Sequence, residues 1–322
     1  MSAPEHTLEG QVAIVTGAGR GLGRSYARAF AAAGATVVVN DIGVDDDGAG
    51  VGRRRADVVV EEIIAAGGRA EASGDDIATA DGGRSLVEQA IALGGRLDIV
   101  VHNAGLTTRA AAAAIGRDSL APVPFVEADV GLLHGYFESH LAGAFYVGQP
   151  AWRQMEKARY GRIVLTSSAS TFGYDTEGYS LSKMAVLSLA RGMARDAAAT
   201  GLDIKVNAVA PMAATAPPHA AENERFRGLM DPDNVAAAVL YLASPSCELQ
   251  GAWLRVGATY VGEIFLGLTA GWAPADHRIT VASVADNLGE VRTLDGFAVP
   301  TDNSSVNAVM RRRIFGDGAA PA

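Results

Sequence analysis

The chain has 322 residues, 49% of them hydrophobic and 20% charged, which is enough to bury the core of one large domain or two small ones. Its formal net charge of −9 and its isoelectric point near 5.2 argue against a general nucleic-acid or anionic-membrane surface, because phosphate binding needs clustered Lys and Arg. A single cysteine, Cys247, excludes an intrachain disulfide and a cage of thiolate metal ligands.

The N-terminal stretch MSAPEHTLEG contains acidic side chains and no apolar segment, so we expect neither a signal peptide nor an anchor. No later stretch is long and apolar enough to span a membrane. We therefore predict a cytoplasmic protein, which agrees with the reducing compartment that a lone cysteine indicates. The basic triplets at 53–55 and 311–313 are interpreted as solvated spots.

Short β-branched runs alternate with Ala-rich amphipathic stretches along the chain. Because the runs are apolar at successive positions, we predict strands buried on both faces at 12–16, 36–40, 97–101, 162–166 and 204–209. Helices are predicted at 21–33, 54–66, 81–93, 129–157, 178–199 and 232–243. This alternation is typical of a doubly wound, Rossmann-type α/β fold, in which helices cover both faces of a parallel sheet.

Two long connections, 106–128 and 211–230, interrupt this pattern. Both follow strand ends on the side where doubly wound sheets bind ligands. We interpret them as walls or lids of a site, because long connections at that edge are usually functional. A disordered surface loop is the alternative for the Ala-rich run in 106–128.

A glycine-rich segment, Thr16–Gly23 (TGAGRGLG), follows the first predicted strand and opens the first helix. Its backbone amides and the positive end of the helix dipole would face the pyrophosphate of a dinucleotide. Glycine is needed where the chain turns sharply and where a Cβ would block the phosphates. We therefore assign cofactor binding to Gly17, Arg20, Gly21, Leu22 and Gly23.

Asp41 closes the second predicted strand, about 20 residues past the glycines, where a carboxylate accepts hydrogen bonds from both hydroxyls of the adenosine ribose. Its negative charge would repel a 2′-phosphate, which favours NAD(H) over NADP(H). Arg20 opposes this preference, because an arginine inside the loop can grip a phosphate. We expect the charge at the ribose edge to dominate and predict NAD as the cofactor.

Tyr179 and Lys183 open the helix predicted at 178–199 and share one helical face because they are four residues apart. An ammonium ion there would stabilise tyrosinate and lower the phenol's pKa from about 10, which makes the tyrosine a usable acid or base. Ser168 would hydrogen-bond a substrate oxygen on which charge develops. A silent NAD-binding protein would be expected to lack one of these three side chains, and all three are present.

In this order, the glycine loop, Asn103-Ala104-Gly105, Ser167-Ser168 and the Tyr179/Lys183 pair resemble the short-chain dehydrogenase/reductase family over residues 8–257. The resemblance implies that Tyr179 is the catalytic acid/base, that Lys183 lowers its pKa and holds the nicotinamide ribose, and that Ser168 orients the substrate. The cofactor-binding residues that it implies beyond the glycine loop are Asp41, Asp76, Ile77, Asn103, Gly105, Tyr179, Lys183, Pro211 and Thr215.

The same resemblance sets the expected domain organisation. Residues 8–257 would form one dinucleotide-binding and catalytic domain, and 258–322 would form a C-terminal extension that packs on the core or on a neighbouring subunit. Members of the family form homodimers or homotetramers through the helices that hold His140 and Tyr179. Ala-rich faces such as MAVLSLARGMA would allow close packing there.

Within the family, several strings are most similar to the (3R)-hydroxyacyl-CoA dehydrogenase part of the peroxisomal multifunctional enzyme type 2: VVVNDIG, VVVEEIIAAGGRA, HLAGAF, YGRIVLTSSAS and LASPSCELQGAWLRVGA. This likeness implies an oxidoreductase that interconverts a secondary alcohol and a ketone by hydride transfer, with a 3-hydroxyacyl thioester as substrate. The alternative substrates are free secondary alcohols, hydroxysteroids and cyclic ketones. This chemistry requires no metal, and the histidines show no zinc-site spacing.

Three features depart from the family pattern. His140 stands where most members have asparagine, and both a proton relay and helix packing are open roles for it. Ser168 lies two residues closer to the tyrosine than usual, which leaves Ser167 and Ser170 as alternatives. The 106–128 connection is about a dozen residues longer than in the multifunctional enzyme, and we expect it to reshape the substrate pocket.

Overall fold

The computed structural model describes residues 7–43, 54–117, 121–214 and 228–316. The chain forms two compact units, Met1–Glu263 and Ile264–Ala322, and each is described by itself. The first unit carries the glycine loop and the tyrosine–lysine pair, so its sheet decides where those side chains lie.

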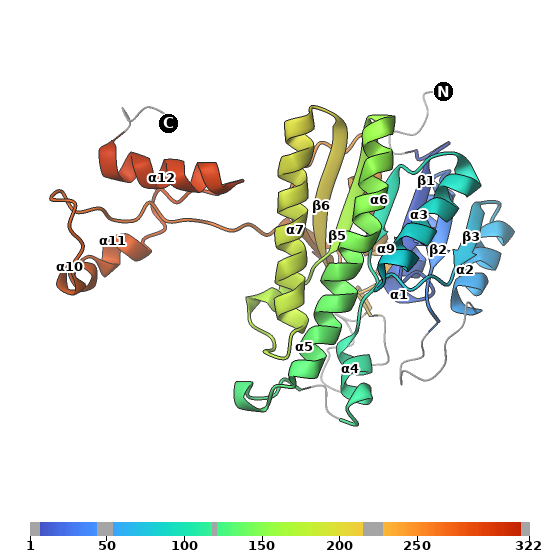
Figure 1. Ribbon diagram of the computed structural model, residues 1–322, viewed down its shortest axis with the longest axis horizontal. Coiled ribbons are helices and arrows are strands. Elements are labelled where there is room, and N and C mark those ends of the chain that lie inside the picture. The colour runs from blue at the N-terminus through green and yellow to red at the C-terminus, as the bar shows by residue number, and fades with distance from the viewer. Residues whose placement is uncertain (1–6, 44–53, 118–120, 215–227, 317–322) are drawn as a thin grey trace. The chain divides into compact units, whose positions relative to one another are not determined.

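An eight-stranded sheet forms the centre of the first unit (Figure 1). Its strands are β1 (Val12–Thr16), β2 (Thr36–Asn40), β3 (Arg69–Ser73), β4 (Ile99–His102), β5 (Tyr160–Thr166), β6 (Asp203–Met212), β7 (Trp253–Gly257) and β8 (Tyr260–Glu263). They are ordered β3-β2-β1-β4-β5-β6-β7-β8, and all neighbours are parallel except β7 and β8. The order reverses between β1 and β4, and such a switch point creates a ligand crevice at the carboxyl ends of the strands.

Helices cover both faces of this sheet. Those in the described part of the first unit are α1 (Gly21–Ala32), α2 (Arg54–Ala65), α3 (Ala80–Gly94), α4 (Thr108–Ala114), α5 (Val130–Phe137), α6 (Gly143–Ala158), α7 (Tyr179–Thr200) and α9 (Pro232–Ala243). One large apolar cluster joins α1, α2 and α9 to one face of the sheet. Helices α3, α6 and α7 pack on the other face (Figure 1).

The predicted doubly wound α/β fold is confirmed. Strands β1 and β2 cover the predicted residues, and every residue of β1 is buried, as expected for a strand covered on both faces. Five of the six predicted helices agree to within one residue at each end. The predicted helix 129–157 is instead interrupted by a π-helical turn, Glu138–Ala142, between α5 and α6. A π turn adds a residue to the helical path and often occurs at functional sites.

Within the described residues of the first unit, three strands and one α-helix were not predicted. Strand β3 (RAEAS) lies at the sheet edge and is partly exposed, so it lacks the apolar run of a central strand. Strand β7 and its antiparallel partner β8 complete the other edge, although β8 falls within the predicted extension. Helix α4 forms inside the 106–128 connection, where the Thr107 hydroxyl caps the Ala run by accepting a hydrogen bond from the Ala110 amide.

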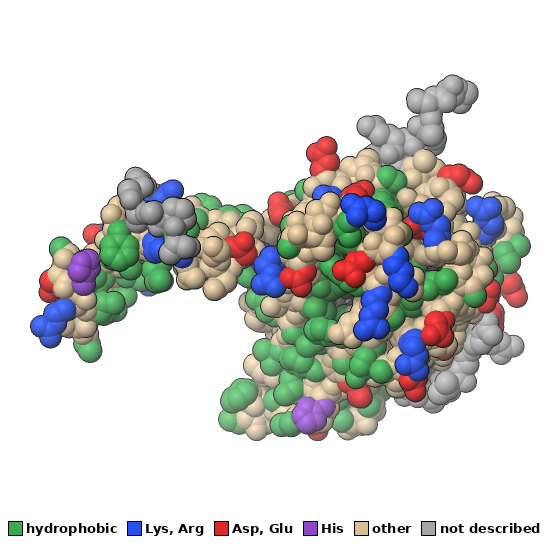
Figure 2. Space-filling model, turned by 45° about the horizontal axis from the view of Figure 1, so that its top comes forward, with side chains coloured by type: hydrophobic (Ala, Val, Ile, Leu, Met, Phe, Trp, Pro, Cys, Tyr) green, Lys and Arg blue, Asp and Glu red, His purple; other side chains and the backbone are tan. Residues whose placement is uncertain are grey.

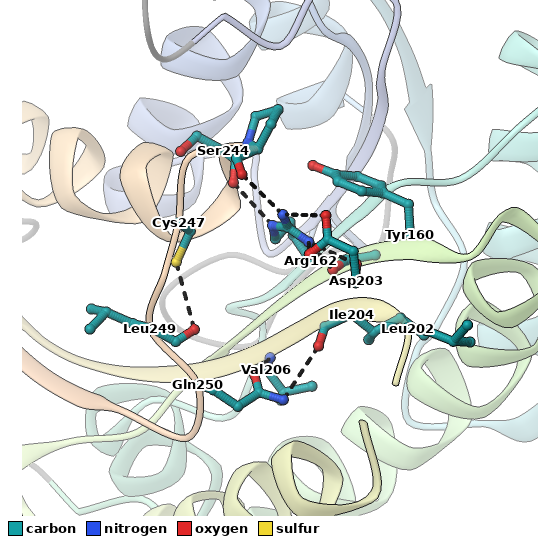
Figure 3. Close-up of polar contacts among 12 residues, drawn as sticks. Tyr160, Arg162, Leu202, Asp203, Ile204, Val206, Ser244, Cys247, Leu249 and Gln250 are labelled. Carbon is teal, nitrogen blue, oxygen red and sulfur yellow. Dashed lines mark hydrogen bonds and ion pairs between the residues drawn. The ribbon is translucent and has the colours of Figure 1, made fainter. Parts of the chain in front are cut away.

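Arg162 joins several segments by hydrogen bonds at the amino ends of the strands, opposite the crevice at their carboxyl ends (Figure 3). Its buried guanidinium donates to the carbonyl oxygens of Gly161, Asp203, Ser244 and Pro245 and forms an ion pair with the Asp203 carboxylate. Because Ser244 and Pro245 follow α9, this network joins the end of that helix to the first residues of β5 and β6. A buried charge is tolerated here because its donors are paired.

The surface of the first unit carries charges of both signs. On the face shown in Figure 2, basic and acidic side chains are interspersed and form no large patch of one sign. Among the helices of the described ranges, none combines the length and the apolar character that crossing a bilayer requires.

The second unit contains, within its described residues, the helices α10 (Val281–Asp286), α11 (Leu288–Arg292) and α12 (Asn303–Phe315) and an isolated β-bridge between Leu268 and Ala298. Thr280 and Asp302 form capping boxes at the starts of α10 and α12. None of these three helices has a buried residue. The packing of this unit on the core or on a neighbouring subunit stays a prediction.

Candidate active site

The glycine loop lies between β1 and α1, at the switch point of the sheet. A Cβ on Gly17 would lie 2.8 Å from the Ala104 Cα, and one on Gly23 would lie 2.1 Å from the Gly17 carbonyl oxygen. Gly17 and Gly21 have φ angles of 60° and 53°, which glycine adopts without strain. The Arg20 side chain does not cap α1, so the first-turn amides of the helix suit an anionic ligand. These close approaches form a cradle that fits a dinucleotide pyrophosphate.

Asp41 lies against this loop at the end of β2. Its Oδ2 accepts a hydrogen bond from the Gly19 amide at 3.0 Å, and its Oδ1 accepts one from the Gly43 amide at 2.8 Å. The two bonds hold the carboxylate at the place where we expect the adenosine ribose. Leu22, by contrast, is partly buried and packs against the core cluster.

Asn103 joins the carboxyl ends of β1 and β4. Its Nδ2 donates to the carbonyl oxygens of Thr16 and Gly17, each at 3.1 Å. The Thr16 hydroxyl in turn accepts hydrogen bonds from the amides of Asn103 and Ala104, both at 3.0 Å. The Asn103 side chain therefore shapes the start of the glycine loop.

The other predicted cofactor-binding residues lie along the same sheet edge. Asp76 is exposed, and its Oδ1 accepts a hydrogen bond from the amide two residues later, whereas Ile77 is buried. Pro211 lies in β6, and its carbonyl oxygen accepts a hydrogen bond from Arg255 at 3.1 Å. Thr215 lies outside the described residues.

Ser168, Tyr179 and Lys183 meet between the end of β5 and the start of α7. The side chains of Ser168 and Tyr179 are close enough to interact, and the Ser168 hydroxyl accepts a hydrogen bond from the Ser170 amide at 3.1 Å. Lys183 lies one turn along α7, with its Nζ 5.7 Å from the centre of the Tyr179 ring. Of the alternative serines, Ser167 donates its hydroxyl to the Lys183 carbonyl oxygen, and the Ser170 hydroxyl has no partner within the described part of the chain. Ser168 is thus the candidate serine that the fold brings to the tyrosine.

Burial controls the charge of Tyr179 and Lys183. The Nζ of Lys183 donates to the Thr166 carbonyl oxygen at 3.0 Å, and burial lowers the pKa of Lys183 from 10.5 to about 7. Burial also raises the pKa of Tyr179, while the contact with the Ser168 side chain acts to lower it. In the chain by itself, burial outweighs the lowering contact with Ser168, and the lowering of the Tyr179 pKa by Lys183 stays a prediction.

His140 is buried in the π-helical turn and packs beside the tyrosine. Its ring centre lies 5.6 Å from that of Tyr179, and its Nδ1 lies 2.8 Å from the Ser182 hydroxyl oxygen. Gly105 approaches so closely that a Cβ there would lie 1.9 Å from the His140 Cδ2. Burial, followed by the charge of Lys183, lowers the pKa of His140 well below its usual value of 6.5. These contacts favour the packing interpretation of His140.

An apolar cluster beside Tyr179 was not predicted from the sequence. Ala111 of α4 and Leu132 and Tyr136 of α5 are buried together, and Leu106 and Tyr179 pack against them. The 106–128 connection therefore forms part of the surroundings of the tyrosine. A run of alanines has no distinct apolar face, so its sequence gave no sign of which side would be buried.

A family model described as short chain dehydrogenase matches residues 11–225, which is more than half of the chain. The chain belongs to the short-chain dehydrogenase family. It is therefore an oxidoreductase that acts on a CH–OH group.

The relatives of this short-chain dehydrogenase include larger and similar-sized proteins. It is 34% identical over 321 residues to peroxisomal multifunctional enzyme type 2 of Mus musculus, covering 98% of this chain but only 41% of the mouse protein. It is 35% identical over 298 residues to a short-chain type dehydrogenase/reductase of Mycobacterium tuberculosis, covering 90% of this chain and 96% of that one.

The fold is also similar to that of a solved structure of 7α-hydroxysteroid dehydrogenase complexed with NADH and 7-oxo glycochenodeoxycholic acid. The TM-score is 0.64 at 30% sequence identity, and the match covers 79% of this chain and 96% of that one. The predicted membership of the family and the predicted similarity to multifunctional enzyme type 2 are thus confirmed.

Proposed function

We propose that this short-chain dehydrogenase uses NAD(H) to interconvert the secondary alcohol and the ketone of a 3-hydroxyacyl thioester of coenzyme A. The observation that carries the catalytic part is the meeting of Ser168, Tyr179 and Lys183 at the carboxyl edge of the sheet. A phenol, a neighbouring serine hydroxyl and a buried amine there lie on the same edge as the glycine cradle.

In this proposal Tyr179 transfers the proton. During oxidation the tyrosinate oxygen takes the proton of the substrate hydroxyl, and during reduction the phenol gives that proton to the carbonyl oxygen. Ser168 holds the reacting oxygen in place. When bound, the nicotinamide supplies the hydride acceptor or donor.

Lys183 stabilises tyrosinate only when the lysine amine is itself protonated. Burial lowers the pKa of the amine to about 7 in the chain by itself, which disfavours its charged form. Hydrogen bonds from its ammonium to ribose hydroxyls, together with negative phosphates at the glycine loop, would favour the charged form. The site thus fits a dinucleotide whose binding prepares the lysine for its role.

Asp41 supports the choice of NAD. Its carboxylate is held beside Gly19 by the bond to that amide, so a 2′-phosphate at the ribose would meet a fixed negative charge. The hydroxysteroid dehydrogenase of similar fold is described with NADH. We expect Asp41→Ser to raise the use of NADP⁺ relative to NAD⁺.

The thioester substrate is supported by the similarity to multifunctional enzyme type 2, of which this chain spans about two fifths. The second candidate is a free secondary alcohol such as a hydroxysteroid or a cyclic alcohol. The similarity in fold to the hydroxysteroid dehydrogenase favours this alternative. Both candidates use the same proton-transfer residues and differ in what the pocket must enclose.

Nicotinamide absorbance tests the proposal. The purified protein would be given NAD⁺ or NADP⁺ with (3R)-3-hydroxyacyl-CoAs, free secondary alcohols and hydroxysteroids, alongside Tyr179→Phe. Turnover of the thioesters with NAD⁺, lost in the variant, supports the proposed function. Turnover of free alcohols alone means that a free alcohol replaces the thioester as the proposed substrate. Activity that survives in Tyr179→Phe refutes the proposed mechanism.

We also propose that the protein is a cytoplasmic homodimer or homotetramer. Exposed apolar side chains on α6 and α7, namely Phe145, Leu181 and Met184, support an interface on these helices. Light scattering of the purified protein tests the assembly, and fractionation of cells tests the location.

A further inference from the structure

A bidentate ion pair ties the 106–128 connection to the loop that carries Tyr179. The Nη1 of Arg117 donates to Oε1 of Glu177 at 2.9 Å, and its Nη2 donates to Oε2 at 2.6 Å. The side chain of Glu177 is 8% exposed and that of Arg117 is 24% exposed. A planar fork of this kind fixes orientation as well as distance. It joins segments that are 60 residues apart in the sequence.

The arginine is held in place by its own helix. Gly116 has a φ of 68° and its amide donates to the Ala113 carbonyl oxygen, while the Arg117 amide donates to that of Ala112 at 2.8 Å. This pair of bonds is the Schellman ending of α4. Through Ala111, α4 also packs on α5, which lies at the same end of the unit (Figure 1). Arg117 is therefore anchored before it reaches Glu177.

The glutamate sits in the turn that starts α7. Gly178 has a φ of 121° and separates Glu177 from Tyr179; a Cβ on it would lie 2.8 Å from the backbone of α5. Asp175 accepts hydrogen bonds from the amide and hydroxyl of Ser180 at 3.0 and 2.6 Å and from the amide of Glu177 at 3.1 Å. The turn is thus folded around the carboxylates of Asp175 and Glu177. The guanidinium of Arg117 compensates the negative charge of Glu177.

We propose that Arg117 is a positioning residue for Tyr179. By holding Glu177 it keeps the turn before α7 closed and so sets the distance from the tyrosine to Ser168. Without the guanidinium, the buried carboxylate of Glu177 is uncompensated and pulls the turn towards water. The kinetic consequence rests on the proposed function of Tyr179, whereas the structural consequence does not.

Two variants separate positioning from simple charge compensation. Arg117→Gln removes the fork and leaves the Glu177 carboxylate buried. The double variant Arg117→Gln, Glu177→Gln removes the charge as well but does not restore the fork. A matched control is Arg96→Gln, which breaks another bidentate pair, with the fully buried Asp98, at the opposite edge of the sheet.

We expect Arg117→Gln to lower kcat about 10- to 100-fold, the effect of a displacement near 1 Å, with the Kd for NADH unchanged. Amide hydrogen exchange in 173–180 should accelerate, because the turn opens. The double variant should have the Tm of the wild type. Its kcat should stay below that of the wild type, and its amide exchange in 173–180 should stay faster. Arg96→Gln should lower the Tm with kcat and exchange in 173–180 unchanged.

Two results overturn the proposal. One is unchanged exchange of 173–180 in Arg117→Gln, and the other is a double variant in which kcat returns to the wild-type value together with the Tm. If the wild type turns over no alcohol or ketone, the proposed function fails, and exchange alone then decides the role of Arg117.

Discussion

Replacing Lys183 by methionine is expected to abolish activity and yet stabilise the protein at neutral pH. The folded pKa of about 7 lies below the 10.5 of a free lysine, so between these values the unfolded chain binds more protons than the folded one. The free energy of unfolding therefore rises with pH across this window. Burying Lys183 costs about 4 kcal/mol at pH 7 and about 2 kcal/mol at pH 9.

Methionine is similar in length and carries no charge, so it removes this cost. It also leaves the Thr166 carbonyl oxygen without its donor, at a cost of about 1 to 3 kcal/mol. The variant should thus gain about 1 to 3 kcal/mol at pH 7, and its advantage should fall by about 2 kcal/mol at pH 9. The buried histidines do not disturb the comparison, because burial lowers the pKa values of both His102 and His140 below 6.5.

Urea unfolding of both proteins at pH 7 and pH 9, without cofactor, measures this difference. Lys157→Met, which removes an exposed lysine of α6, controls for the loss of a lysine as such. A difference between wild type and Lys183→Met that does not change from pH 7 to pH 9 would refute the assignment of a desolvated amine.

Three further predictions concern single side chains. Tyr179→Phe should reduce kcat by about 10²- to 10⁴-fold while the Kd for NADH changes far less, and cofactor fluorescence beside steady-state rates would show it. Gly105→Ala should destabilise the fold by about 1 to 3 kcal/mol, since its Cβ would lie 1.9 Å from the His140 Cδ2. Gly192→Ala in α7, where a Cβ meets nothing within 4 Å, should instead be neutral or stabilising in the same thermal melts. Arg162→Leu should lower the Tm by many degrees, because it leaves four carbonyl oxygens without this donor; an unchanged Tm would contradict the network of Figure 3.

The sequence by itself determined the fold class and the order in which the site residues follow one another along the chain. Buried strands such as β1 (VAIVT) and β2 (TVVVN) contain an unbroken run of apolar residues, and glycines stand where turns are tight, so both features are visible in neighbouring residues. Tyr179 and Lys183 share a helical face by spacing alone. Strand β3 escaped prediction because one face of an edge strand is exposed, and α4 because its alanines show no periodic face.

Only the tertiary structure decided which remote side chains meet and what charge they carry. The fork between Arg117 and Glu177 joins segments 60 residues apart, and Ser168 was chosen from three serines by the turn that follows β5. The pKa of Lys183 falls and that of Tyr179 rises because other elements exclude water from both. Desolvation depends on everything packed around a group, so no local pattern in the sequence reveals it.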